Sequence, residues 1–221
     1  TSIFELYLES FTAADSVLEH GKKSLEEMKM LDIIGADEGD PSPEDILATV
    51  QDSQSSLSEG YASLKANLKY STSTGGPRSV QFTSTKSGEG KSVSSLGLAV
   101  RCANDDIRTL LIDADMRRPT FKQETGDAMG LSGVLTQEVD FAQGISPTQI
   151  PNLSLMKSGR QVTNPSGLLS SSRFDDLLAW AEEHYDFVIV DGPPVLGLAD
   201  ATILGAKVAA TLLVVEADKL R

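Results

Sequence analysis

Residues 83 to 92 read TSTKSGEGKS and hold two glycines and two lysines. The residues just before them, RSVQF at 78 to 82, are typical of a short strand. The residues just after them, 93 to 103, carry apolar side chains three or four positions apart, as a helix does. A glycine-rich turn between a strand and a helix leaves backbone N–H groups at a helix N-terminus, where anions bind. The sequence therefore predicts a phosphate-binding loop.

The loop follows the pattern G-x-x-x-x-G-K-[ST], except that Thr85 replaces the first glycine. Gly88 and Gly90 allow the backbone to turn its N–H groups inward without a clash at Cβ. The Lys91 side chain can reach the β- and γ-phosphates of a nucleotide, and the hydroxyl of Ser92 is a suitable Mg²⁺ ligand. We expect the bound anion to be a nucleoside triphosphate.

Carboxylates follow two later apolar runs. LLIDADMRRP, residues 110 to 119, places Asp113 and Asp115 at the end of one predicted strand, and FVIVDGPP, residues 187 to 194, places Asp191 at the end of another. Ligands of open α/β sheets bind at the carboxyl ends of the strands. A carboxylate in this position holds Mg²⁺ in P-loop enzymes, whereas the alternative role is that of a strand-terminal cap.

Apolar runs alternate with helical stretches such as residues 172 to 184, which predicts successive βαβ units. The strands are rich in Val, Ile and Leu without clean alternation, as strands buried on both faces are. We therefore expect an α/β P-loop NTPase fold, in which helices flank a mostly parallel sheet. The predicted strands cover residues 79–84, 109–115, 153–158, 186–192 and 210–217.

The first 50 residues differ in composition from the rest. Residues 1 to 60 hold 14 of the 32 acidic residues and only three lysines, within a chain of formal net charge −13. The spacing of apolar residues in 1 to 34 predicts amphipathic helices, and 35 to 45 read as an acidic Gly/Pro linker. We expect an acidic helical segment over 1–50 and a P-loop domain over 51–221. The acidity argues against a nucleic-acid partner.

Together these motifs carry a family resemblance. GEGKS, LLIDADMRRP and FVIVDGPP in this order resemble the bacterial tyrosine kinases (BY-kinases) that work with exopolysaccharide chain-length regulators. The segments GLSGVL, NLSLMKSG, NPSGLLSSSRFDDLL and SLSEGYASLKANLKYS are similar to the same family. The resemblance covers about residues 50 to 217. It implies transfer of the ATP γ-phosphoryl group to tyrosine hydroxyls, with Mg²⁺ as the cofactor.

The resemblance also implies roles for individual residues. Lys91, Asp113, Asp115 and Asp191 are the expected catalytic residues. Ser92, Asp113 and Asp191 are the expected Mg²⁺ ligands, with Asp113 alternatively assisting the tyrosine hydroxyl. The expected nucleotide-binding residues are Lys86, Ser87, Gly88, Glu89, Gly90, Lys91, Ser92, Val93 and Arg117.

The partners implied by the resemblance are the transmembrane region of a polysaccharide co-polymerase, neighbouring kinase subunits and a tyrosine-rich C-terminal tail. The implied location is the cytoplasmic face of the bacterial inner membrane, and the implied role is control of exopolysaccharide chain length and export. In the family, the acceptor tyrosines lie in that tail. The chain is expected to be a fragment that ends before the tail and before the elements that complete the sheet.

The sequence departs from the family pattern on the helix that mediates self-assembly. There the family has E-x-x-R-x-x-R, whereas Glu59 is followed here by Ala62 and Lys65, which puts ring assembly in question.

Lys86 makes the loop similar to that of partition-type ATPases, in which an early lysine reaches the nucleotide of a dimer partner. The alternative, which we favour, is that Lys86 is an exposed loop lysine without this role. Two alternatives to the kinase therefore stay open at this point. One is a partition-type switch controlled by nucleotide-dependent dimerisation, and the other is a scaffold that binds nucleotide without kinase activity.

The four tyrosines fall into two groups. Tyr61 lies on the apolar stripe of its predicted helix and Tyr185 lies beside a buried strand, so both are expected in the core. Tyr70 and Tyr7 are expected to be partly exposed.

Overall fold

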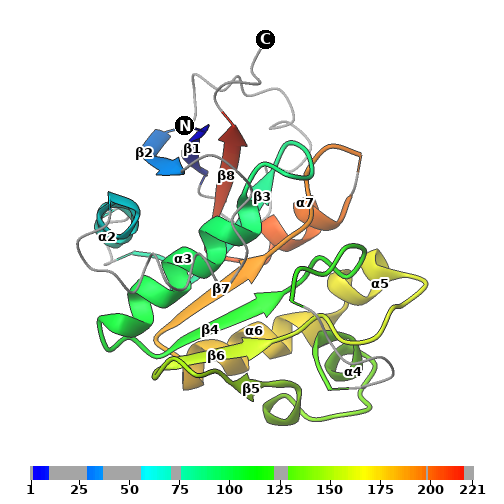
Figure 1. Cartoon of the computed structure of the whole chain (residues 1–221). Coiled ribbons are helices and arrows are strands. Elements are labelled where there is room, and N and C mark those ends of the chain that lie inside the picture. The colour runs from blue at the N-terminus through cyan, green and yellow to red at the C-terminus, as the bar shows by residue number, and fades with distance from the viewer. Residues whose placement is uncertain are drawn as a thin grey trace.

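The computed structural model describes residues 2–9, 29–36, 56–70, 76–121, 129–197 and 199–216. Its strands form one sheet in the order β2-β1-β8-β3-β7-β4-β6-β5, and the strands from β8 to β6 are parallel (Figure 1). The parallel strands are β8 (Ala210–Glu216), β3 (Ser79–Ser84), β7 (Phe187–Asp191), β4 (Thr109–Asp113) and β6 (Leu153–Met156). The predicted mostly parallel α/β fold is confirmed.

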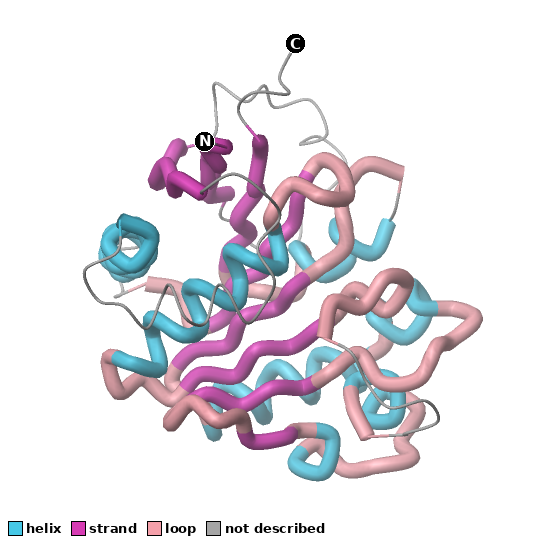
Figure 2. Tube along the Cα trace, viewed as in Figure 1, coloured by secondary structure: helices cyan, strands magenta, loops and turns pink. Residues whose placement is uncertain are grey.

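Helices cover both faces of this sheet (Figure 2). One face carries α2 (Ser56–Lys69) and α3 (Lys91–Asn104), and the other carries α4 (Leu131–Leu135), α5 (Pro165–Ser170), α6 (Ser172–His184) and α7 (Ala199–Gly205). A short helix, η3 (Ala142–Gly144), precedes the edge strand β5 (Ser146–Pro147), which pairs antiparallel with β6.

The central strands β4 and β7 contribute side chains to two hydrophobic clusters, one on each face of the sheet. In β4, Leu111 packs with α2 and α3, whereas Leu110 and Ile112 pack with the helices of the other face. In β7, Ile189 belongs to the first cluster and Val190 to the second. This double burial explains why these two strands lack an alternating polar pattern.

The N-terminal helices predicted over residues 1 to 34 are wrong for both stretches that the structure describes there. β1 (Ser2–Glu9) pairs antiparallel with β8, and β2 (Lys29–Ala36) pairs antiparallel with β1. Phe4 and Leu8 fit a helical stripe, but Phe4, Leu6 and Leu8 fit the two-residue period of a strand equally well. The free edge of β8 favours a strand over a helix for these residues, because an unpaired strand edge is a ready template for another strand.

The rest of the predicted helical segment, and residues 37–45 of the predicted linker, lie outside the described residues. Within the described part of the chain, no helix is long and apolar enough to cross a membrane.

Candidate active site

The predicted phosphate loop joins β3 to α3, as the sequence suggests. Gly88 and Gly90 have φ angles of 89° and 80°, the left-handed region that favours glycine. Gly90 is the N-cap of α3, and no side chain caps this helix end. The first N–H groups of α3 can therefore bind an anion.

Glu89 stabilises this loop by hydrogen bonds within it. Its buried carboxylate accepts hydrogen bonds from the Thr85 hydroxyl at 2.7 and 2.8 Å and from the backbone N–H of Lys86 at 2.7 Å. The hydroxyl that replaces the first glycine of the motif thus has a structural use. The structure places the Glu89 side chain as a support of the loop, so any contact between Glu89 and a nucleotide would come from its backbone.

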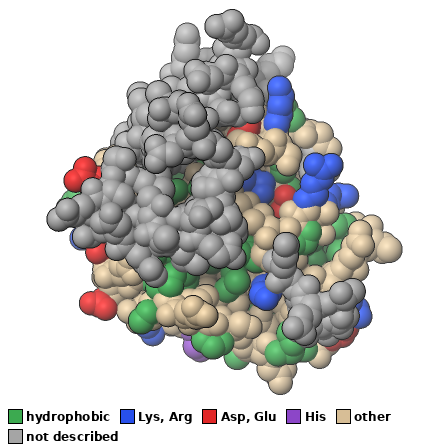
Figure 3. Space-filling model, viewed as in Figure 1, with side chains coloured by type: hydrophobic (Ala, Val, Ile, Leu, Met, Phe, Trp, Pro, Cys, Tyr) green, Lys and Arg blue, Asp and Glu red, His purple; other side chains and the backbone are tan. Residues whose placement is uncertain are grey.

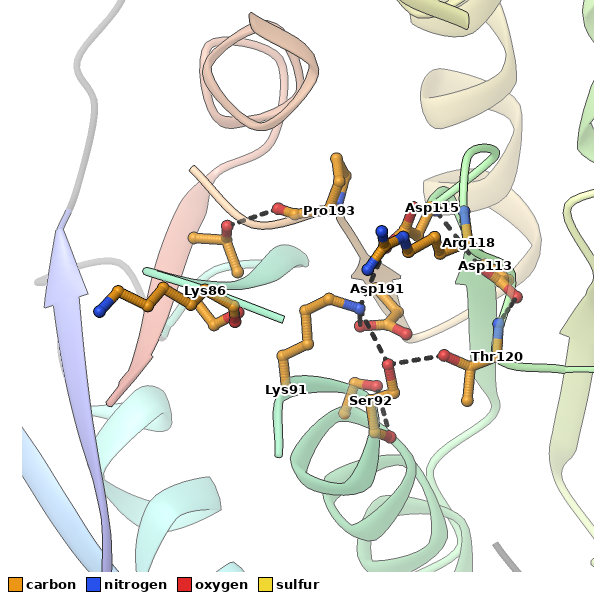
Figure 4. Close-up of polar contacts among 12 residues, drawn as sticks. Lys86, Lys91, Ser92, Asp113, Asp115, Arg118, Thr120, Asp191 and Pro193 are labelled. Carbon is orange, nitrogen blue, oxygen red and sulfur yellow. Dashed lines mark hydrogen bonds and ion pairs between the residues drawn. The ribbon is translucent and has the colours of Figure 1, made fainter. Parts of the chain in front are cut away.

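Lys91, at the start of α3, points into a cluster of carboxylates (Figure 4). Its ammonium nitrogen lies 3.4 Å from Oδ2 of Asp115, 3.7 Å from Oδ1 of Asp191 and 3.0 Å from the hydroxyl of Ser92. The Ser92 hydroxyl also accepts a hydrogen bond from Thr120 at 2.9 Å. All four residues expected to be catalytic, Lys91, Asp113, Asp115 and Asp191, thus lie at one edge of the sheet.

Asp113 ends β4 beside Asp191, its Cα partner at the end of β7. Its Oδ2 accepts hydrogen bonds from the backbone N–H groups of Thr120 and Phe121 at 3.0 and 3.1 Å, and its Oδ1 accepts one from Asp115 at 3.2 Å. Burial, followed by the charge of Asp191, raises the pKa of Asp113 to about 7. Asp113 can therefore change its protonation state near neutral pH.

Asp191 is fully buried, and neither of its carboxylate oxygens has a hydrogen-bond partner among the described residues. Burial raises its pKa, while the ammonium of Lys91 acts in the opposite direction. A buried carboxylate left without hydrogen bonds is costly unless a cation occupies its other side. The donor set of Asp191, Asp113 and Ser92 fits Mg²⁺, which typically binds one or two carboxylates together with phosphate oxygens.

That donor set is not a closed metal cage. No group of three or more His, Cys, Asp or Glu side chains able to hold a metal occurs within the described residues. A magnesium ion at this site would therefore have to share its ligands with the nucleotide phosphates.

Arg117 lies near the cluster but is held by residues on the other face of the sheet. Its Nε donates to Oδ2 of the buried Asp200 at 2.7 Å, and its terminal nitrogen donates to Ser166 at 3.2 Å. Ser166 in turn donates to the other oxygen of Asp200. This network joins the loop after β4 to α5 and α7.

The remaining predicted nucleotide contacts lie at the margin of the cluster. Lys86, Ser87 and Gly88 are exposed, and the Lys86 side chain extends away from Lys91 (Figure 4). The side chain of Val93 packs against the hydrophobic cluster beneath α2 and α3, so only its backbone N–H could meet a phosphate. The oligomerisation residues lie on α2. Glu59 is exposed, Ala62 is half-buried, and Lys65 forms an ion pair with Asp105 of the same chain.

A cavity of about 420 Å³ adjoins the carboxylate cluster. Its walls come from the loops after β3, β4 and β7, and Asp115 belongs both to the cavity wall and to the cluster around Lys91. Sequence reasoning missed Thr120, Ser166, Asp200 and this cavity. Thr120 directly follows the motif LLIDADMRRP, which is a signal for it, whereas Ser166 and Asp200 carry no comparable pattern.

The sequence of the chain is similar to a protein family and to individual proteins of known name. A family model described as an AAA domain matches residues 78–219. Tyrosine-protein kinase YwqD of Bacillus subtilis is 36% identical over 167 residues, which cover 73% of this chain and 69% of YwqD. Tyrosine-protein kinase wzc of Salmonella typhi is 36% identical over 158 residues, or 71% of this chain, but the match spans only 22% of wzc.

Solved structures of tyrosine kinase domains also match the chain. The tyrosine kinase domain of BceF matches with a TM-score of 0.67 and 34% identity, over 75% of this chain and 67% of that one. The kinase domain of the Escherichia coli tyrosine kinase ETK matches with a TM-score of 0.67 and 27% identity, over 90% of this chain and 74% of that one. The Pyrococcus furiosus cell division ATPase MinD, at 19% identity and a TM-score of 0.50 over 59% of this chain and 56% of that one, shares the fold.

Proposed function

The chain belongs to the AAA domain family and to the bacterial tyrosine-protein kinases, and we propose that it transfers the γ-phosphoryl group of ATP to tyrosine hydroxyls. The observation that carries this proposal is the convergence of Lys91 with Asp113, Asp115 and Asp191 beside the uncapped N-terminus of α3. Phosphoryl transfer requires mainly positioned phosphates and neutralised charge, which such a site supplies.

Each residue has a proposed role. The N–H groups of the loop and of the first turn of α3 hold the phosphates, and Lys91 neutralises their charge. Ser92 and Asp191 hold Mg²⁺, which when bound draws negative charge from the phosphate oxygens. Asp113, with a pKa of about 7, either shares the metal or accepts the proton of the tyrosine hydroxyl.

Asp115 keeps the ammonium of Lys91 in place, since its Oδ2 lies 3.4 Å from that group. Arg117 is tied to Asp200 by its Nε and to Ser166 by a terminal nitrogen. A contact between Arg117 and the nucleotide is therefore proposed only for nitrogens that these two residues leave free.

The wider setting is also a proposal. The family resemblance supports a role in exopolysaccharide or capsule synthesis, at the cytoplasmic face of the inner membrane. There the chain would act with a polysaccharide co-polymerase and phosphorylate a tyrosine-rich tail. Neighbouring subunits would have to associate without the arginines of the family's helix motif, and Lys65 is already paired with Asp105 of its own chain.

The test is phosphotyrosine formation. The protein is incubated with Mg-ATP and a tyrosine-rich peptide, and the products are analysed by mass spectrometry. We expect labelled peptide with the native chain, and at least a roughly hundredfold loss with Asp191→Asn, because electrostatic stabilisation of phosphoryl transfer is lost. Asp186→Asn, which changes an exposed carboxylate paired with Arg108, is the matched control and should keep its activity. Unlabelled peptide with the native chain would contradict the kinase assignment.

Lys86 supports a second candidate, the partition-type switch. Its side chain is exposed and, within the described residues, its ammonium has no ion-pair partner, so it is available to reach another molecule. Light scattering with Mg-ATP tests this function. ATP-dependent dimers that disappear in Lys86→Ala would favour the switch, whereas a scattering profile unchanged by nucleotide would exclude it.

A further inference from the structure

The cavity beside the carboxylate cluster differs in charge from the rest of the molecule. The whole chain carries a formal net charge of −13, yet the cavity walls contain Lys86, Arg117 and Arg118 and only one carboxylate, Asp115. Lys and Arg side chains gather on the face of the molecule over this part of the sheet (Figure 3). Asp115 is already within 3.4 Å of the ammonium of Lys91, so it offsets little of this charge.

Arg117 and Arg118 have different surroundings. The guanidinium of Arg117 is held by the buried Asp200 and by Ser166. Arg117 therefore lines the cavity, but its positive charge is compensated by the carboxylate of Asp200. Arg118 is exposed, and within the described residues only its backbone N–H is hydrogen-bonded, donating to Oδ1 of Asp115 at 3.0 Å and to the backbone carbonyl of Asp115 at 3.2 Å. The guanidinium of Arg118 therefore has no carboxylate partner in the described part of the chain.

The same cavity has an apolar rim. Pro194 and Leu196 line it, and Leu196 is 62% exposed next to Val195, which is 37% exposed. Few large apolar side chains in the described part of the chain are as exposed as these. An apolar surface next to an unpaired guanidinium suits a ligand that combines an aromatic ring with carboxylates.

We propose that this cavity binds the acceptor segment and selects a tyrosine that has acidic neighbours in sequence. The aromatic ring lies against Pro194 and Leu196, and a neighbouring carboxylate pairs with Arg118. Asp115 is shared with the Lys91 cluster, so a ring seated here lies next to the transferring group. The inference rests on the proposed kinase function, because it names the substrate class of that same site.

The experiment separates recognition from catalysis by using peptides that cannot react. Two fluorescent peptides carry one phenylalanine flanked on both sides by glutamates or by glutamines, and their binding is measured by anisotropy with and without Mg²⁺ and a non-hydrolysable ATP analogue. We expect tighter binding of the glutamate peptide, by up to about fivefold for each exposed ion pair. The preference should weaken as salt is raised.

Arg118→Gln should remove most of this preference. Arg108→Gln, which neutralises an exposed arginine paired with Asp186 outside the cavity lining, should keep it. Equal affinities of the two peptides for the native chain, or a preference unchanged by Arg118→Gln, would overturn the cavity assignment. A rise in the KM for ATP in Arg118→Gln, with unchanged peptide affinity, would overturn it too by assigning the arginine to the nucleotide.

Tyrosine versions of both peptides report on the kinase function separately. Preferential binding of the glutamate peptide without labelling of either tyrosine peptide would support the cavity assignment and contradict the kinase function. Labelling of both tyrosine peptides with the same KM would support the kinase function and contradict the selection of acidic neighbours.

Discussion

Asp113 and Asp191 are Cα partners at the carboxyl ends of the adjacent parallel strands β4 and β7, and both side chains are fully buried. Two carboxylates this close in a buried site disfavour each other's ionised form. Lys91 compensates part of this charge from 3.7 Å away from Asp191. The pair can therefore accept a further cation, and without one the negative charge of the two carboxylates is compensated only in part.

Burial and the repulsion between the two carboxylates make the stability of the folded chain depend on pH. The pKa of Asp113 is raised from 3.8 to about 7 in the folded chain, so between these values the folded state holds a proton that the unfolded state has lost. The stability contributed by Asp113 is therefore fully present below about pH 4 and is lost as pH rises through about 7. The loss is at most about 4 kcal/mol, since one pKa unit corresponds to about 1.4 kcal/mol.

Urea unfolding of the nucleotide-free chain between about pH 4 and pH 7.5 checks this linkage. Asp113→Asn should flatten the fall in unfolding free energy over that range relative to the native chain. Asp186→Asn is the control, because Arg108 lowers the pKa of that exposed carboxyl and its removal should not flatten the fall. The same pH profile in Asp113→Asn and the native chain would refute the raised pKa.

Lys91→Ala should lower nucleotide affinity by roughly ten- to a hundredfold, which is the range for losing a charge-assisted contact. The lysine is buried beside Asp115 and Asp191, so the variant should also be less stable without nucleotide. Calorimetry with Mg-ATP measures the affinity, and circular dichroism checks the fold. Native affinity in a folded Lys91→Ala would show that the lysine does not meet the phosphates.

The packing of α2 on α3 depends on Gly97. A Cβ at this position would overlap the ring of Tyr61, which is buried with 1% of its surface exposed. Gly97→Ala should therefore lower the unfolding free energy by about 1–3 kcal/mol. Adding Tyr61→Leu should cost less than the sum of the two single changes, because the second change removes the clash. Additive losses would indicate that the helices do not meet there.

The exposure of the tyrosines predicts which of them can be modified. Tyr61 and Tyr70 match expectation, since Tyr61 is buried and Tyr70 is 78% exposed, while Tyr185 is half-buried against the core of the other face. Burial raises the pKa of Tyr61, and a packed hydroxyl cannot reach a phosphate without local unfolding. After incubation with Mg-ATP, mapping should find phosphate on Tyr70 before Tyr61. Rapid stoichiometric labelling of Tyr61 would contradict this order.

Much of the site could be predicted because its residues lie in short motifs next to strand ends. Lys91 and Ser92 follow a glycine-rich loop, and Asp113 and Asp191 follow apolar runs, so the parallel fold brings them to one edge. The partner of Arg117 could not be predicted, because Asp200 lies 83 residues away and meets it only through the packing of α7.

The N-terminal strands escaped sequence reasoning for a similar reason. Over eight residues the apolar pattern of β1 suits a strand or a helix, and its pairing with β8 depends on residues some 200 positions later in the chain. A local pattern could not choose between the two.

The kinase function is tested most directly by following the γ-phosphoryl group in a single turnover. The protein, in excess over γ-labelled Mg-ATP, is mixed with a saturating tyrosine-rich peptide, and the label is divided between phosphotyrosine and free phosphate. A kinase should pass most of the label to tyrosine, and with a phenylalanine version of the peptide it should leave ATP largely uncleaved over the same time. Release of all the label as free phosphate at an equal rate with either peptide would contradict a kinase and identify an ATPase.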